Sequence, residues 1–124
     1  MAKKESPRNE RTNGKTTIAP RVLVTIARLT TLSITGVSRM ASVPGGVNRI
    51  FHRGIGEGVR IEIEDNQVSV DLYVVLEKDV HVREVSINIQ NAISRAITEM
   101  VGLQTKTVNI HIEEIQYAGD AVED

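Results

Sequence analysis

Apolar and polar residues alternate along residues 59–77, and this is the clearest pattern in the chain. The alternation is that of β-strands with one apolar and one polar face. Asp65 and Asn66 interrupt it, and both residue types tolerate the left-handed backbone of a two-residue hairpin turn. A hairpin around this turn pairs Glu64 with Gln67, Ile63 with Val68, Ile61 with Val70 and Arg60 with Asp71.

Residues 20–33 have the apolar period of an amphipathic helix. Pro20 suits the first turn of a helix, and Gly36 lies where this helix is expected to end. We expect its buried stripe to consist of Val22, Ile26 and Leu29, with Leu23 and Leu32 at the margins and Arg21, Arg28 and Thr31 facing elsewhere. Residues 34–43 follow as an irregular, largely apolar connector.

A second helical period extends from Asp79, the expected N-cap, to Gly102, the expected C-cap glycine. Ile87 lies off the apolar stripe of this helix and is expected on the surface. The predicted buried stripe consists of Val82, Val85, Ile89, Ile93, Ala96, Ile97 and Met100.

Alternation returns at residues 107–113 and predicts a third long strand, while residues 16–19 fit a short edge strand. The predicted order is therefore β(short)-α-β-β-α-β. This order is typical of a two-layer α/β (α+β) domain, in which two amphipathic helices cover one face of a mostly antiparallel, three-stranded sheet. We assign residues 16–117 to this single domain, 1–15 to a flexible basic arm and 118–124 to an acidic tail.

Residues 43–59 contain five of the nine glycines of the chain. The segment resembles a phosphate loop only in its glycine content, because no Lys-Ser/Thr pair follows it and the next element is a strand. We predict instead a joint with a short amphipathic helix, whose apolar side holds Val47, Ile50 and Phe51 and whose polar side holds Asn48, Arg49, His52 and Arg53.

The composition narrows the function classes. The absence of cysteine excludes disulfides, Cys-ligated zinc and a thiol nucleophile, and it favours a cytoplasmic protein. The only aromatic residues are Phe51, Tyr73 and Tyr117, too few for a base-stacking surface that binds nucleic acid. No segment approaches the roughly 20 apolar residues that a membrane-spanning helix needs.

Charge is divided unevenly along the chain. Residues 1–56 contain ten Lys or Arg and two acids, whereas residues 57–124 contain five Lys or Arg and fourteen acids. Folding either interleaves these charges or leaves opposite surface patches, and patches favour an assembly of protomers that weakens with salt.

The polar face of the predicted sheet is a candidate catalytic or metal site. Asp71, His111 and Glu113 are residue types that a hydrolase or a metal site uses. A solvated antiparallel face has the same composition, however, and catalytic groups usually lie in a pocket. We therefore assign no catalytic, cofactor-binding or metal-binding residue. The candidate interaction surface consists of Arg49, His52, Arg53, Tyr73, Val75, Ile87 and His111.

Residues 16–115 resemble the alkaline shock protein family of general stress proteins. The most specific matches are the segments VDLYVV at 70–75, MVGL at 100–103 and VNIHI at 108–112. The resemblance implies a non-enzymatic cytoplasmic protein linked to cell-envelope stress or lipid metabolism, and some members are held at the membrane by an anchoring partner. The family commonly carries acids where this chain has residues 33–37, so the first half of this chain is unusually basic.

We therefore expect a non-enzymatic protein without cofactors that self-associates, binds protein partners and lies in the cytoplasm or, through a membrane-anchored partner, at the membrane periphery. One alternative is a module for anionic ligands, either KH-like RNA binding or contact with acidic lipid, through Arg21, Arg28, Arg39, Arg49 and Arg53. The other alternative is an enzyme that uses Asp71, His111 and Glu113.

Overall fold

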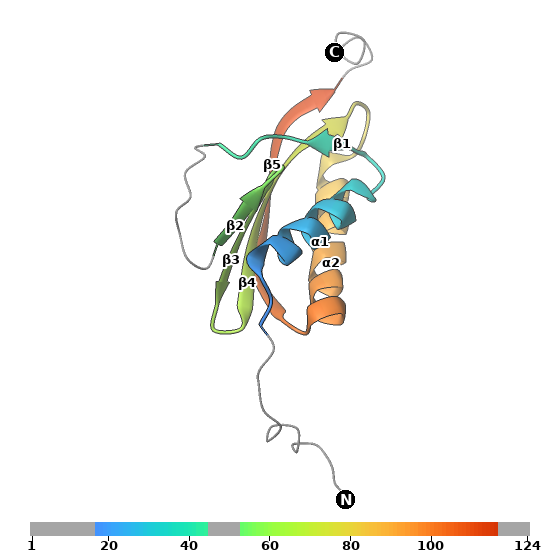
Figure 1. Ribbon diagram of the computed structural model, residues 1–124. Helices are drawn as coiled ribbons and strands as arrows, with labels where there is room; N and C mark the ends of the chain where they lie inside the picture. Colours follow the sequence, from blue (N-terminus) through green and yellow to red (C-terminus); the bar gives the residue numbers. More distant parts are fainter. Residues whose placement is uncertain (1–16, 45–52, 117–124) are drawn as a thin grey trace, which may run out of the picture.

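The computed structural model describes residues 17–44 and 53–116 of the chain (Figure 1). Two helices lie on one face of a five-stranded sheet. In chain order the elements are α1 (Pro20–Leu32), β1 (Val37–Met40), β2 (Arg53–Gly56), β3 (Val59–Glu64), β4 (Gln67–Glu77), α2 (Val82–Val101) and β5 (Gln104–Gln116). The predicted two-layer α+β class and the order of the helices and long strands are confirmed.

Strands β3 and β4 form the predicted hairpin in the predicted register. Ile63 lies opposite Val68, and Arg60 lies opposite Asp71. The two turn residues have the left-handed backbone expected of them, with φ of 51° at Asp65 and 65° at Asn66.

Strand β4 is the centre of the sheet and pairs with three others. Along one edge, β3 pairs with its first half and β1 with its second half, both antiparallel. Strand β5 runs parallel to β4 along the other edge, because helix α2 returns the chain to the end of the sheet at which β4 begins. Strand β2 pairs with the outer edge of β3.

The prediction of a three-stranded sheet was wrong, because the sheet has five strands. Residues 34–43, predicted as an irregular connector, contain β1, whose four residues are too few to show an alternating pattern. Residues 17–19, predicted as part of a strand, belong to no strand, and Ala19 is the N-cap of α1, with its carbonyl accepting the amide of Val22. The predicted arm, tail and most of the short helix lie outside the described residues, and Arg53 begins β2 instead of ending a helix.

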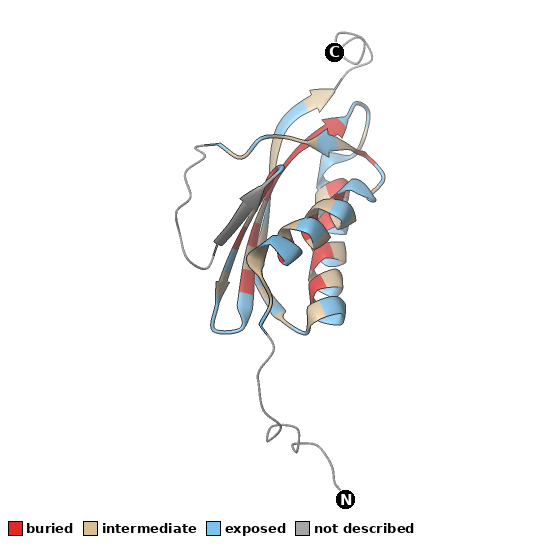
Figure 2. Ribbon diagram, viewed as in Figure 1, coloured by how far each residue is buried: buried red, intermediate tan, exposed pale blue. Residues whose placement is uncertain are grey.

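The core lies between the helices and the sheet (Figure 2). From the sheet it contains alternate residues of β3 and β4, as the sequence predicted, and from α2 it contains one side chain per turn. The fully buried aliphatic residues of these elements are Val59, Ile61, Val68, Val70, Leu72, Val74, Leu76, Ile89, Ile93 and Ile97.

Helix α1 is rotated relative to the prediction. Its buried side consists of Leu23, Ala27 and Thr31, whereas Val22 and Leu29 are exposed. The prediction followed the large aliphatic residues, but the buried line of α1 is made largely of small ones. The hydroxyl of Thr31 is satisfied within the helix, since it donates to the Ala27 carbonyl at 2.7 Å.

Helix α2 begins later than predicted. His81 is the N-cap, and Asp79 lies before the helix with a left-handed backbone (φ 64°). Gly102 is the predicted C-cap, with φ of 76°. Val82 and Met100, at the two ends of the predicted stripe, are exposed.

Candidate functional site

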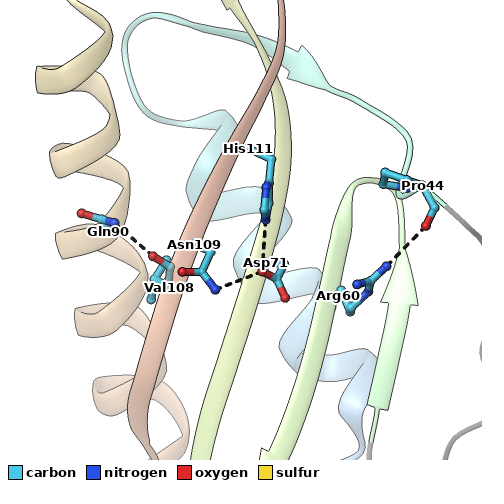
Figure 3. A network of polar contacts seen from close by, with 7 residues as sticks. All are labelled: Pro44, Arg60, Asp71, Gln90, Val108, Asn109 and His111. Atoms are coloured by element: carbon cyan, nitrogen blue, oxygen red, sulfur yellow. Dashed lines mark hydrogen bonds and ion pairs between the residues drawn. The ribbon is translucent and has the colours of Figure 1, made fainter.

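The polar face of the sheet carries a group of side chains from β3, β4 and β5, and Figure 3 shows Asp71 of this group between Asn109 and His111. Asp71 of β4 lies beside Asn109 of β5 in the parallel register. Asn109 Nδ2 donates to Asp71 Oδ1 at 3.1 Å, and His111 Nε2 lies 3.2 Å from the same oxygen. Because an ionised carboxylate only accepts, the ring nitrogen of His111 that faces it carries the proton.

Tyr73 and Arg60 extend this group. The rings of Tyr73 and His111 are stacked, with their centroids 4.4 Å apart and their planes 9° from parallel. The guanidinium carbon of Arg60 lies 5.9 Å from the centre of the Tyr73 ring. We refer to Arg60, Asp71, Tyr73, Asn109 and His111 as the outer-face cluster.

Arg60 also fixes the chain that follows β1. Its Nη2 donates to the carbonyl of Pro44 at 3.3 Å. Its Nε is buried without a hydrogen-bond partner among the residues that the structure describes. The guanidinium is therefore held by the Tyr73 ring and the Pro44 carbonyl, and its Nε is buried.

The polar groups of the outer-face cluster are paired with one another, and this pairing limits their ability to bind or act on a ligand. Asp71 Oδ1 already has two partners, and one face of the His111 ring is covered by Tyr73. The described residues contain no group of three or more His, Cys, Asp or Glu placed to hold a metal ion. The arrangement is suited to a rigid polar surface.

Glu113, the third residue of the enzyme alternative, falls at an irregularity in β5. The register pairs Val74 with Ile112 and then Val75 with Glu114, so Glu113 is the extra residue. Glu114 takes the place beside Val75, and its carboxylate lies 3.9 Å from Arg39. The alternation in the sequence could not show this shift.

The structure brings together only part of the predicted interaction surface. Tyr73 and His111 are in contact, but Tyr73 is 7% exposed and Val75 is 2% exposed, so these two side chains offer little area to a partner. Ile87 is exposed, as predicted, but it lies on α2 in the helical layer. Arg49, His52 and the side chain of Arg53 lie outside the described part of the chain.

Asp71, Tyr73 and His111 of the outer-face cluster were candidate residues in the sequence, whereas Arg60 and Asn109 were assigned no site role. The hairpin register does place Arg60 opposite Asp71. The contacts of Asp71 with Asn109 and His111 depend on the parallel register between β4 and β5, which no local pattern fixes.

A hollow of about 530 Å³ lies between α1, β1 and the turn from β2 to β3. Arg28 lies at this hollow, and its Nε is 2.7 Å from the carboxylate of Glu57. None of the cluster residues lines it. Its lining consists of Arg28, Leu32, Arg39, Met40, Ala41, Ser42, Val43, Glu57 and Gly58.

Comparison with known protein families shows to which family the chain belongs. The model of the alkaline shock protein 23 family, described as having a cell envelope-related function, matches residues 8–117. The chain belongs to this family. The match spans both helices and all five strands, which confirms the resemblance predicted from the three short segments.

The chain is similar to several bacterial proteins over most of their length, and each of these is named as an uncharacterized protein. YqhY of Bacillus subtilis is 31% identical over 89% of this chain and 83% of its own length. Spy1535 of Streptococcus pyogenes is 34% identical over 82% of this chain and 79% of its own length. YloU of Bacillus subtilis is 23% identical over 83% of this chain and 89% of its own length.

No solved structure matches the chain. Among the described residues, neither helix has the length and apolar character required to span a membrane. The family to which the chain belongs has a cell envelope-related function.

Proposed function

We propose that the chain is a non-enzymatic protein that acts at the cell envelope through self-association and through contacts with protein partners. We place it in the cytoplasm, held at the membrane periphery by a membrane-anchored partner. Membership of a family with a cell envelope-related function supports the location. The internal pairing of the outer-face cluster supports a non-enzymatic role, because its polar groups are engaged with one another.

The distribution of charge is the observation that carries the self-association part of the proposal. Residues 17–44, which include α1 and β1, contain Arg21, Arg28 and Arg39 and no acid. Residues 57–116 contain eleven acids and five Lys or Arg. Opposite charges on different elements of one chain favour contacts between copies, and such contacts weaken as salt shortens the range of electrostatic attraction.

Part of this charge is neutralised within one copy. Arg28 is paired with Glu57, and Arg39 lies near Glu114. Arg21 has no ion-pair partner among the described residues, and it is exposed at the start of α1. Arg21 is therefore the cation of α1 that is available to a second copy.

Sedimentation velocity of the full chain tests the proposal. We expect species larger than a monomer in about 0.1 M salt and their loss in about 1 M salt, where the screening length falls from about 10 to about 3 Å. Arg21→Glu should weaken the association, and Arg95→Glu on α2 is the matched control, because Arg95 is already near Glu99 on its own helix. A monomer in both salt conditions would contradict self-association.

A further inference from the structure

Helix α1 carries a second apolar stripe on the side that faces away from the core. Val22, Thr25, Leu29 and Leu32 follow one another at intervals of three, four and three residues. All four are exposed, and the three aliphatic side chains are 42%, 54% and 39% exposed in chain order. We call these four residues the outward seam.

The spacing of the outward seam is that of the a and d positions in a coiled coil. Residues spaced in this way form the holes into which the side chains of a facing helix insert. The buried side of the same helix is a different line, formed by Leu23, Ala27 and Thr31. Helix α1 is therefore built to pack on both sides, and among the described residues only the inner side is covered.

The charges beside the outward seam indicate what kind of helix fits it. Arg21 and Arg28 each directly precede an a position, and α1 contains no acidic residue. Residues at this position lie beside the seam and contact the flanking residues of the facing helix. Arg28 is already paired with Glu57 within one copy, so Arg21 is the cation beside the seam that is available to an acidic residue of the facing helix.

A second copy of α1 does not supply such acids. In an antiparallel pair of copies, the residues that precede the a positions face one another, so arginine would meet arginine. In a parallel pair, they face the residues that follow the d positions, which are Ile26 and Ser33. Neither orientation gives either arginine a carboxylate.

The hollow described above adjoins one end of the outward seam. Leu32 is both the last residue of the seam and part of the lining of the hollow. Met40 and Val43 add apolar lining. The charged groups of the hollow are partly paired, since Arg28 contacts Glu57 and Arg39 lies near Glu114. A helix that lies along the seam can therefore place a large apolar side chain in the hollow beyond Leu32.

From these observations we propose that the outward seam of α1 and the adjoining hollow bind an amphipathic helix with acidic flanks from a partner protein. This inference rests on the partner-binding part of the proposed function and is independent of self-association. The apolar side chains supply the contact area, and Arg21, together with the absence of acids on α1, selects against basic helices.

A designed helical peptide tests the proposal with the full chain. The probe is a fluorescein-labelled helix with leucine at a and d and glutamate at e and g, and the comparison peptide has lysine at e and g. Like charges at e and g oppose pairing of each peptide with itself. Fluorescence anisotropy in about 0.1 M salt should show the acidic peptide binding at least about tenfold more tightly than the basic peptide.

Two variants locate the binding site. Leu29→Asp should weaken binding of the acidic peptide by about tenfold or more, because it removes the most exposed aliphatic residue of the seam and adds a like charge. Ile87→Asp, an exposed isoleucine on α2, should leave binding unchanged. Circular dichroism of both variants establishes that any loss of binding does not come from unfolding.

Several outcomes would overturn the proposal. These are failure of the acidic peptide to bind, equal binding of the two peptides, or no effect of Leu29→Asp. Loss of self-association in Leu29→Asp, measured by sedimentation, would show that a second copy covers the seam. Binding of the full chain to phosphatidylglycerol vesicles that depends on Leu29 would assign the seam to lipid. Self-association that persists while peptide binding fails would refute this inference alone and leave the proposed function standing.

Discussion

Replacement of Gly58 by alanine tests the way in which three strands meet in this sheet. At Tyr73, the edge of β4 passes from β3 to β1: the Tyr73 amide donates to the Gly58 carbonyl at 2.8 Å, and the Ala41 amide donates to the Tyr73 carbonyl at 2.7 Å. Gly58 is buried at this junction with a left-handed backbone, φ 83°. A side chain at this position therefore meets both a backbone and a packing constraint.

The structure gives the size of each constraint. A Cβ at position 58 would lie 2.5 Å from the Ala41 carbonyl oxygen, 2.8 Å from the Met40 Cβ and 2.9 Å from the Tyr73 carbonyl oxygen. Two of these atoms belong to the backbone, so they cannot turn aside. The left-handed backbone costs a non-glycine residue about 1–2 kcal/mol, and overpacking adds about 1–3 kcal/mol. We expect Gly58→Ala to lower the free energy of unfolding by about 2–5 kcal/mol.

Gly102→Ala is the matched control. Gly102 also has a left-handed backbone, φ 76°, but nothing lies within 4 Å of its added Cβ. The free energy of unfolding of this variant should therefore fall only by the cost of the left-handed backbone, about 1–2 kcal/mol. The difference between the two variants measures the crowding at the junction alone.

Urea unfolding followed by far-ultraviolet circular dichroism measures both losses. With a slope of about 2 kcal/mol per molar urea, the midpoint should fall by about 1–2.5 M for Gly58→Ala and about 0.5–1 M for Gly102→Ala. Equal shifts of the two midpoints would refute the crowded junction, and with it the close passage of β1 over the β2–β3 turn.

Two further pairs of substitutions test the rotation of α1 and the packing of α2 in the same unfolding assay. Thr31→Val should change the free energy of unfolding by less than about 1 kcal/mol, because the Ala27 carbonyl keeps its helical hydrogen bond. Thr31→Leu should lower the free energy of unfolding by about 1–3 kcal/mol, because it overpacks a fully buried site. Equal tolerance of valine and leucine would show that Thr31 is not buried. Ile89→Ala should lose about 2–5 kcal/mol as a fully buried residue, and Ile87→Ala should stay within about 0.5 kcal/mol. A large loss at Ile87 would contradict its exposed position.

The parts of the fold that the sequence predicted correctly are those fixed by local patterns. The β3–β4 hairpin follows from alternation on both sides of Asp65 and Asn66, whose residue types select the turn. The end of α2 follows from Gly102, since a glycine is favoured where the backbone becomes left-handed.

The parts that the sequence did not predict depend on contacts between distant segments. The buried side of α1 was missed because Ala27 and Thr31 are small residues that a hydrophobic pattern weighs lightly. Strand β1 was missed because its pairing partner, the second half of β4, lies more than thirty residues away in the chain. The contacts within the outer-face cluster were missed for the same reason, since Asp71 and Tyr73 meet Asn109 and His111 only in the parallel register.

Cross-linking of mixed isotopic copies tests the central claim, that copies of the chain associate through opposite charges, most directly. Labelled and unlabelled full chains are combined and treated in about 0.1 M salt with a carbodiimide, which joins a carboxylate to an amine in direct contact. We predict mixed-isotope cross-links between acids of residues 57–114 and Lys3, Lys4 and Lys15 of the predicted basic arm, residues 1–15, and the loss of these cross-links in about 1 M salt. Cross-links found only within one isotopic species would contradict self-association of the chain.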